Sequence, residues 1–236
     1  MKPTAIISGA SSGIGLACAK RLARAGYRIA MIGRDEGRMA EAFEQVCEAG
    51  NDNTACLPIV ADLGGLPPFD HLVEQTTATL GPVDVLVNAA GYASAIPFED
   101  LSPDEFATTS NVNMRGLFFL TQACYRVMKE RGRGIVVNIS SLAALSPFPG
   151  FSAYGASKAW VDLFTIAIAN EGREHGIRAF SVRPGTVETP MLRGLFPDFP
   201  AEQTVAPEDI AEVVWQLTTE SFRFSSGQAI NVTKQS

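Results

Sequence analysis

The chain has 236 residues, of which 46% are apolar and 19% charged, a composition typical of an ordered globular protein. The formal net charge of −6 argues against a general nucleic-acid binder, because such proteins usually carry a basic face. Met1 leads directly into a strand-like segment without a signal peptide. No apolar run approaches the ~20 residues of a membrane span, so we expect a cytoplasmic protein without a membrane partner.

In chain order, apolar strand-like runs alternate with helical stretches. Strands are predicted over residues 4–8, 27–33, 54–60, 83–87, 134–140, 177–183 and 228–232. Helices are predicted over 13–25, from the second strand to about 48, and over 68–80, 103–129 (long, with room for a bend), 152–175 and 207–218. Apolar strands separated by helices are typical of a parallel sheet covered on both faces. The predicted fold is therefore a single-domain α/β, Rossmann-type, doubly wound sheet of about seven strands over residues 1–236.

Three irregular segments, 90–102, 141–151 and 190–206, follow the carboxyl ends of predicted strands. Ligands bind at this edge of such sheets, so these segments are the expected substrate loops. The four cysteines form no CxxC pair, which predicts reduced thiols. The two histidines lie far apart in sequence, so we expect no metal site.

A glycine-rich turn joins the first strand to the first helix, with the sequence Ser8-Gly9-Ala10-Ser11-Ser12-Gly13-Ile14-Gly15. Glycines here allow a tight turn and a close approach of backbone to a pyrophosphate, which would lie on the helix N-terminus. The spacing is GxxxGxG rather than the common GxGxxG, and a plain glycine-rich turn is the alternative. The strand before it and the helix after it favour a dinucleotide site formed by Gly9, Ser11, Ser12, Gly13, Ile14 and Gly15.

The end of the second strand indicates which dinucleotide is bound. An NAD site usually has a carboxylate there, which bonds the ribose 2′-OH. This strand ends in Gly33-Arg34, and Arg34 could pair with a 2′-phosphate with help from Ser11 or Ser12. NADP(H) is therefore favoured. NAD(H) remains the alternative because Asp35 follows directly.

Tyr154 and Lys158 lie four residues apart on a predicted helix and so share one face. A nearby cation can lower the pKa of a tyrosine, which suits it to acid–base chemistry near neutral pH. An exposed surface pair is the alternative. Ser141 lies thirteen residues before Tyr154, close enough for its hydroxyl to reach the substrate oxygen, while Ser140 should point to the other side of the strand.

Seven segments together make the chain resemble the short-chain dehydrogenase/reductase family over nearly its whole length. In order, they are Gly9-x-x-x-Gly13-x-Gly15, Asp62-Leu63, Asn88-Ala89-Ala90-Gly91, Asn113, Ser141, Tyr154-x-x-x-Lys158 and Pro184-Gly185-x-Val187-x-Thr189. The chain departs from the family pattern at Ala89, where a second asparagine is usual, and at Arg183, where asparagine often precedes Pro-Gly.

The resemblance implies a role for each matching residue. Tyr154 would be the general acid or base, Ser141 would polarise the carbonyl, and Lys158 would lower the tyrosine pKa and bind the nicotinamide ribose. Asn113 would hold a water in a proton relay. Asp62 would contact adenine, Asn88 would steady the central strand and line the cofactor, and Val187 and Thr189 would hold the carboxamide. The cofactor-binding residues beyond the glycine turn and Arg34 are thus Asp62, Leu63, Asn88, Ala89, Ala90, Tyr154, Lys158, Pro184, Gly185, Val187 and Thr189.

The predicted substrate loops supply an apolar wall, which favours a hydrophobic or neutral carbonyl compound or alcohol. Besides Ser141 and Tyr154, the expected pocket residues are Tyr92, Leu142, Phe148, Phe151, Leu192 and Phe196. Simple packing of the loops is the alternative for each. The helix predicted over 152–175 has apolar residues around most of its circumference, which predicts a homodimer or homotetramer.

The leading hypothesis is an NADP(H)-dependent oxidoreductase that interconverts a carbonyl compound and an alcohol. A 3-oxoacyl-[acyl-carrier-protein] reductase is a second reading. It would need a basic rim, to which Arg131 and Arg133 could contribute, yet the chain is acidic. A non-catalytic dinucleotide-binding sensor on the same fold is an alternative of another class, and an epimerase or lyase with bound cofactor is a further one.

Overall fold

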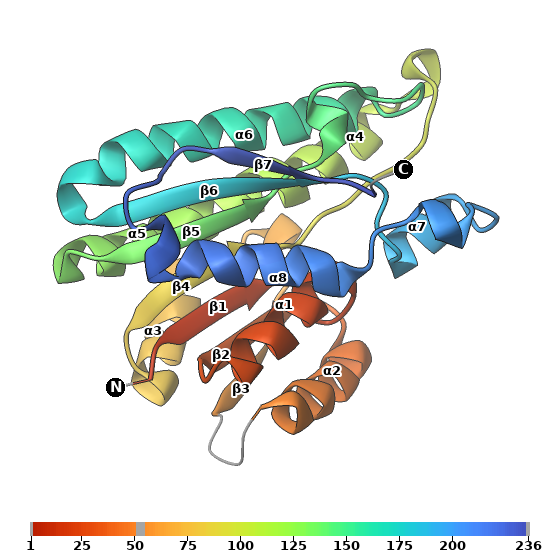
Figure 1. Cartoon of the computed structure of the whole chain (residues 1–236). Coiled ribbons are helices and arrows are strands. Elements are labelled where there is room, and N and C mark those ends of the chain that lie inside the picture. Colours follow the sequence, from red (N-terminus) through yellow and green to blue (C-terminus); the bar gives the residue numbers. More distant parts are fainter. Residues whose placement is uncertain (1, 51–54, 235–236) are drawn as a thin grey trace.

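Seven parallel strands form one sheet in the order β3-β2-β1-β4-β5-β6-β7 in the computed structural model, which describes residues 2–50 and 55–234 (Figure 1). The strands are β1 (Thr4–Ser8), β2 (Arg28–Gly33), β3 (Cys56–Val60), β4 (Val83–Asn88), β5 (Gly134–Ile139), β6 (Ile177–Pro184) and β7 (Ala229–Val232). The predicted doubly wound sheet is confirmed. Thr54, the first residue of the predicted third strand, lies outside the described residues.

Helices cover both faces of this sheet (Figure 1). One layer consists of α1 (Gly13–Arg24), α2 (Glu36–Ala49) and α8 (Pro207–Thr218); the other consists of α3 (Phe69–Leu80), α4 (Pro103–Ser110), α5 (Leu117–Arg131) and α6 (Ser152–Gly172). Side chains alternate along each strand, so neighbouring residues enter different cores. Ile7 and Val87 belong to the core under α1 and α8, whereas Ile6 and Leu86 belong to the core under α3 and α5.

The helix predicted over 103–129 is divided in two by a π-helical segment, Asn111–Gly116, between α4 and α5. Gly116 allows this segment to approach the turn after β3, because a Cβ there would lie 2.8 Å from the carbonyl oxygen of Leu63. Insertions of this kind are frequent at functional sites. The expected bend is therefore a local change of helix type that carries Asn113 towards the carboxyl edge of the sheet.

Residues 190–206, expected to be irregular, contain a short helix, α7 (Pro190–Leu195). The side chain of Thr189 caps it by accepting a hydrogen bond from the backbone N–H of Leu192 at 3.2 Å, and Pro190 occupies its first turn. A threonine cap followed by proline is a standard helix start, so the signal was present in the sequence.

A chain of buried side-chain hydrogen bonds lies at the carboxyl ends of β4 and β5. Asn88 Nδ2 donates to Thr121 Oγ1 and to Asn138 Oδ1, both at 2.9 Å, and Asn138 Nδ2 donates to Thr165 Oγ1 at 2.9 Å. Thr121 lies on α5 and Thr165 on α6, so the chain joins both helices through the two central strands. Asn88 Oδ1 is the one atom of this amide that is buried without a partner among the described residues, so the chain of hydrogen bonds is directional from Asn88 to Thr165.

The described residues contain no helix that is long and apolar enough to cross a membrane. Within the same part of the chain, no group of three or more histidine, cysteine or acidic side chains could hold a metal ion.

Candidate active site

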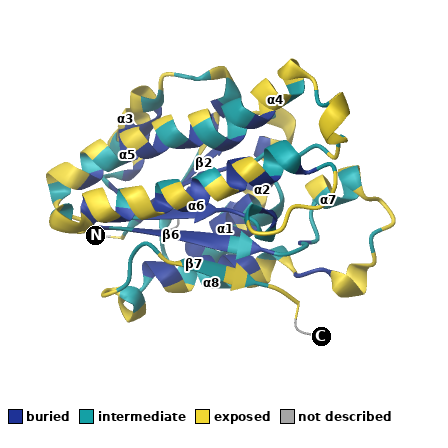
Figure 2. Ribbon diagram, turned by 90° about the horizontal axis from the view of Figure 1, so that it is seen from above, coloured by how far each residue is buried: buried dark blue, intermediate teal, exposed yellow. Residues whose placement is uncertain are grey.

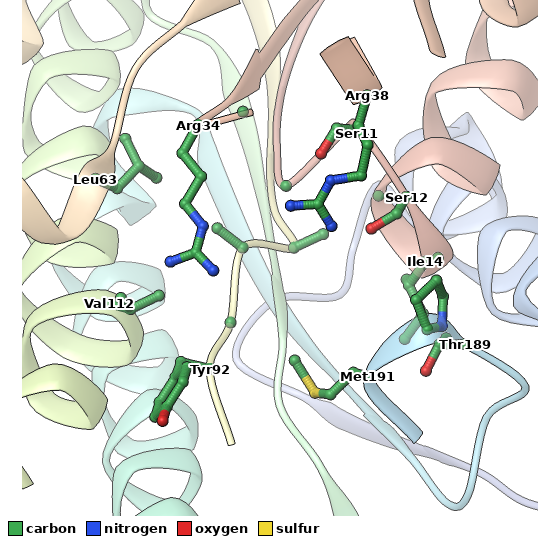
Figure 3. Close-up of a pocket in the computed structure, with 18 of the residues that line it drawn as sticks. Ser11, Ser12, Ile14, Arg34, Arg38, Leu63, Tyr92, Val112, Thr189 and Met191 are labelled. Atoms are coloured by element: carbon green, nitrogen blue, oxygen red, sulfur yellow. The ribbon is translucent and has the colours of Figure 1, made fainter. Parts of the chain in front are cut away.

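A cleft of about 440 Å³ opens where the sheet order reverses, beside the carboxyl ends of β1 and β4 (Figure 3). Such a switch point is where open α/β sheets bind their ligands. The cleft is lined by twelve of the residues expected to bind a cofactor: Gly9, Ser11, Ser12, Gly13, Ile14, Gly15, Arg34, Asp62, Leu63, Ala89, Ala90 and Thr189. It also contains residues that sequence reasoning missed, among them Arg38, Val112 and Met191.

The glycine turn forms a cradle that side chains would fill. Gly9 has φ +68°, and a Cβ there would lie 2.7 Å from the backbone nitrogen of Ala90. A Cβ on Gly15 would lie 2.2 Å from the carbonyl oxygen of Gly9. Ser12, the residue before α1, makes no side-chain cap, so that the first N–H groups of α1 are left for an anion. These features fit the pyrophosphate of a dinucleotide.

Two arginines project into the cleft near the end of β2. Figure 3 shows the guanidinium groups of Arg34 and Arg38 both pointing into it. Asp35, whose presence favoured the NAD(H) alternative, is engaged elsewhere: it caps α2 by accepting from the backbone N–H of Arg38 at 2.9 Å, and it pairs with the Arg38 guanidinium at 3.1 Å. These contacts with Arg38 lower the pKa of Asp35. The carboxylate is thus held by the helix it begins.

The opposite wall is formed by turns after β3 and β4. Asp62 Oδ1 accepts a hydrogen bond from the backbone N–H of Gly64 at 3.0 Å and so begins the turn that carries Leu63. Ser8 Oγ accepts from the backbone N–H groups of Ala89 and Ala90, each at 3.1 Å, and fixes the backbone after β4.

Besides Tyr154 and Lys158, four residues expected to bind the cofactor lie outside the cleft lining. Asn88 steadies the central strands as expected, but its side chain is buried in the amide chain and does not line the cleft. Pro184, Gly185 and Val187 do not line it either. Val187 is buried, and its carbonyl oxygen accepts from the Thr189 hydroxyl at 3.3 Å, which orients the residue that does line the cleft.

Tyr154 and Lys158 lie on the first turns of α6, next to the end of β5. Lys158 is buried, and its Nζ donates to the carbonyl oxygen of Ile139 at 2.8 Å and lies 5.6 Å from the Tyr154 ring centroid. Burial lowers the pKa of Lys158 to about 8, against the opposing effect of the Asp162 carboxylate. Ser141 is hydrogen-bonded to Tyr154, whereas Ser140 points into the core and donates to the carbonyl oxygen of Lys158 at 3.1 Å, as expected.

The protein alone does not lower the pKa of Tyr154. Burial raises it, and the hydrogen bond with Ser141 is the opposing influence. The expected lowering of the pKa is therefore absent from the protein without a bound dinucleotide, because desolvation of the phenolate outweighs the hydrogen bond with Ser141.

The Asn113 side chain connects the loop after β4 with α6. Its Oδ1 accepts from the backbone N–H of Tyr92 at 2.8 Å, and its Nδ2 donates to the Tyr92 carbonyl oxygen at 2.9 Å and to Ser157 Oγ at 3.0 Å. Ser157 in turn donates to the carbonyl oxygen of Tyr154 at 2.7 Å. The amide of Asn113 is thus used to position the backbone at Tyr92 and Tyr154.

An aromatic cluster lies beside the Tyr154 ring. Phe151 meets Tyr154 edge-on with ring centroids 5.6 Å apart, and Phe196 stacks on Phe151 at 6.0 Å. Phe148 contacts Phe151 at 6.4 Å and is 70% exposed. The structure thus brings three of the expected substrate residues together beside Tyr154.

The other three expected substrate residues lie elsewhere. Tyr92 lines the dinucleotide cleft, and its hydroxyl is hydrogen-bonded to Glu105. Leu142 begins the short turn after Ser141 and lies close to Gly185. On α7, Met191 and Leu195 line the cleft, whereas Leu192 does not. The helical phase of α7 decides which of its side chains face the cleft, and a prediction of irregular structure does not contain that phase.

A glycine cradle beside a serine, a tyrosine and a buried lysine, on a Rossmann-type sheet, defines the class of dinucleotide-dependent oxidoreductases. The family model described as short chain dehydrogenase matches residues 3–199. The chain belongs to this family, whose enzymes act on CH–OH and C=O groups.

Similar proteins cover almost the whole chain. An acetoacetyl-CoA reductase from Shinella zoogloeoides is 32% identical over 98% of this chain and 97% of its own. Among solved structures, a variant of actinorhodin polyketide ketoreductase with NADPH has a TM-score of 0.91 at 30% identity, covering 98% of this chain and 96% of its own. A 3-ketoacyl-(acyl-carrier-protein) reductase from Brucella melitensis complexed with NADH has a TM-score of 0.90 at 30% identity and the same coverages.

Proposed function

We propose that the protein is an NADP(H)-dependent oxidoreductase that interconverts a carbonyl compound and an alcohol, with Tyr154 as the general acid or base. The observation that carries the proposal is the hydrogen bond of Tyr154 with Ser141 and the position of the buried Lys158 beside the tyrosine ring and next to Gly91, a residue of the cleft lining. A sensor that only binds a dinucleotide would need no such proton donor. A bound nicotinamide supplies the hydride for reduction or accepts it in oxidation.

The residues of the chain have separate tasks in this reaction. The hydroxyls of Ser141 and Tyr154 hold the substrate oxygen, and Tyr154 donates a proton to that oxygen as it gains negative charge in reduction. Lys158 holds its ammonium group beside the tyrosine and is fixed there by Ile139. Asn113 positions Tyr154 through Ser157, and a water on its backbone within the π-helical segment would continue the proton path to Lys158.

The preference for NADP(H) is supported by Arg34 together with Arg38. Guanidinium groups bind phosphate through paired, charge-assisted hydrogen bonds, and two of them face the cleft. The capping role of Asp35 removes the main support for NAD(H). One of the related structures contains NADPH and another contains NADH, so the relatives do not favour one cofactor over the other.

The substrate we propose is an apolar carbonyl compound, held on the cluster of Phe148, Phe151 and Phe196. A 3-oxoacyl thioester is a second candidate, since an acetoacetyl-CoA reductase and a 3-ketoacyl-(acyl-carrier-protein) reductase are among the relatives. The two arginines considered for the basic rim of a carrier-protein site do not line the cleft. Arg131 and Arg133 pair with Asp84 at the start of β4, at the opposite edge of the sheet.

The test is a titration with NADPH and NADH at fixed ionic strength, followed by turnover on a carbonyl panel that includes aromatic ketones and acetoacetyl-CoA. We expect tighter binding of NADPH and its oxidation by wild type but not by Tyr154→Phe. Binding without turnover on any carbonyl would favour the sensor. Product formation without net consumption of cofactor would favour an epimerase or lyase. Binding of neither dinucleotide would overturn the proposal.

The expected homodimer or homotetramer also remains a proposal. The outer side of α6 is exposed in Figure 2 and carries Leu163, 68% exposed, and Ile166, 44% exposed. A second copy of the chain would bury these side chains.

A further inference from the structure

Residues 188–206 form a loop that closes on itself at the base. The backbone N–H of Glu188 donates to the carbonyl oxygen of Val205 at 3.0 Å, and the N–H of Val205 donates to that of Thr186 at 2.9 Å. Within this loop, α7 has no buried residue. Apolar packing therefore contributes little to holding α7 in place over the cleft.

A second cavity of about 1010 Å³ lies behind this loop. Its lining includes Glu188, Arg193 and Thr204 from the loop, and Pro207 and Lys234 from the body of the protein. The side of α7 that faces away from the dinucleotide cleft thus meets open space instead of a packed core. Polar contacts within the loop must define its shape.

Arg193 supplies most of these contacts. Its Nε donates to Glu188 Oε1 at 2.7 Å and its Nη2 to Glu188 Oε2 at 2.5 Å, which is the paired arrangement of a guanidinium on a carboxylate. Its Nη1 donates to the carbonyl oxygens of Pro197 at 2.9 Å and Phe199 at 2.7 Å. One side chain therefore ties the base of the loop to the segment that returns from α7.

The two sides of α7 have different tasks. Met191 and Leu195, one helical turn apart, line the dinucleotide cleft, and Phe196 stacks on Phe151 beside Tyr154. Arg193 lies on the other side and lines the rear cavity but not the cleft. Its polar contacts are with Glu188 and with the backbone of Pro197 and Phe199, so we expect any effect on the reaction to pass through the position of α7.

We propose that Arg193 and Glu188 form a clamp that positions α7, and that this clamp sets how tightly the site holds its carbonyl substrate. The inference rests on the proposed function for its kinetic part, whereas the effect on the loop itself is independent of that function. An isolated exposed ion pair contributes little to stability. This pair differs because the same guanidinium also binds two backbone carbonyls, which a lysine ammonium cannot do in the same planar arrangement.

The test uses four changes at the clamp: Arg193→Met, Glu188→Gln, Arg193→Lys and the exchanged pair Glu188→Arg with Arg193→Glu. The matched control is Arg126→Met, which removes an arginine that binds Asp70 Oδ1 at 2.8 Å on the α3–α5 side. Amide hydrogen exchange by mass spectrometry reports the loop, and steady-state kinetics with the best carbonyl of the panel reports the site.

Arg193→Met and Glu188→Gln should speed amide exchange in residues 190–200 with no change in the sheet. They should raise KM for the carbonyl about tenfold and change kcat about twofold or less, because the chemistry is untouched while binding is weakened. Arg193→Lys should keep the ion pair, and its amide exchange and KM should lie between those of wild type and Arg193→Met. The exchanged pair should bring both quantities part of the way back to the wild-type values. In the Arg126→Met control, both the amide exchange of residues 190–200 and the KM should equal the wild-type values.

Unchanged exchange in residues 190–200 of both Arg193→Met and Glu188→Gln would overturn the clamp. Faster exchange with an unchanged KM would overturn its role in substrate binding. If wild type turns over no carbonyl, the proposed function fails, and the exchange measurement still decides whether the clamp exists. A melting temperature for each variant separates local loosening from global unfolding.

Discussion

Lys158 donates a 2.8 Å hydrogen bond from Nζ to the carbonyl oxygen of Ile139, the last residue of β5. The contact joins the helix that carries Tyr154 to the carboxyl edge of the sheet. It also fixes the ammonium group in a buried position, where the charged form is disfavoured. The bond therefore positions the lysine, and the burial of the ammonium group lowers its pKa.

The pH dependence of stability should reveal this shift. The pKa of Lys158 is lowered from 10.5 to about 8, so between these values the unfolded chain binds a proton that the folded chain does not. The contribution of Lys158 to the free energy of unfolding should therefore rise with pH from about 8 to 10.5. Urea denaturation of wild type and Lys158→Met at pH 7 and pH 10 measures this contribution. The free energy of unfolding of wild type, relative to that of Lys158→Met, should be higher at pH 10 than at pH 7. A difference that is constant with pH would contradict the assignment.

Removal of the Tyr154 hydroxyl should separate binding from chemistry. Tyr154→Phe keeps the edge-on contact with Phe151, so the fold and the affinity for NADPH should be preserved. Turnover should fall by about 10²–10⁴-fold, because the proton donor is lost. Single-turnover oxidation of bound NADPH with excess carbonyl measures the effect, and fluorescence titration checks binding. Near wild-type turnover would exclude Tyr154 as the acid.

The arginines at the end of β2 should govern the choice of cofactor. Arg34→Ala should weaken NADPH binding about tenfold or more and leave NADH binding nearly unchanged, since charge-assisted hydrogen bonds are each worth ~1.5–3 kcal/mol. Arg38→Ala should act in the same direction, although it also removes the ion pair with Asp35 and leaves only the backbone cap. Calorimetric titration of each variant with both dinucleotides measures this. An equal loss for NADH would show that the arginines do not contact the 2′-phosphate.

The exposed side of α6 should mediate self-association. Leu163→Glu would place a charge at the centre of the proposed contact and should shift the protein to monomer in light scattering after gel filtration. Phe224→Glu is the matched control, because Phe224 is 90% exposed and lies outside α6. Wild type that is already monomeric at micromolar concentration would exclude the interface.

Sequence periodicity was sufficient for the sheet and its helices because the inner strands β1, β2, β4, β5 and β6 are buried along most of their length and read as apolar runs. It was also sufficient for the glycine cradle, since the collisions around Gly9 and Gly15 leave no room for another residue. Arg38 was missed because its position depends on α2 beginning at Asp35, which is a local capping event.

The hydrogen-bond partners of Tyr92 and Asn88 could not be predicted for a different reason. Which way a side chain points after a strand depends on long-range partners, here Glu105 for Tyr92 and Asn138 for Asn88. These partners are 13 and 50 residues away in the chain, and no short motif records them. The pKa of Tyr154 escaped prediction because it depends on desolvation, which spacing along a helix does not describe.

The loop of residues 188–206 is joined to the body of the protein at one place, its base. Its ends are fastened by the Val187–Val205 pairing, and the Thr121–Asn88–Asn138–Thr165 chain fixes the catalytic edge without using any residue of the loop. A different loop could therefore be grafted between Val187 and Val205 while Ser141, Tyr154 and Lys158 keep their arrangement. The architecture thus allows new substrate preferences to be tried without rebuilding the machinery that moves the proton.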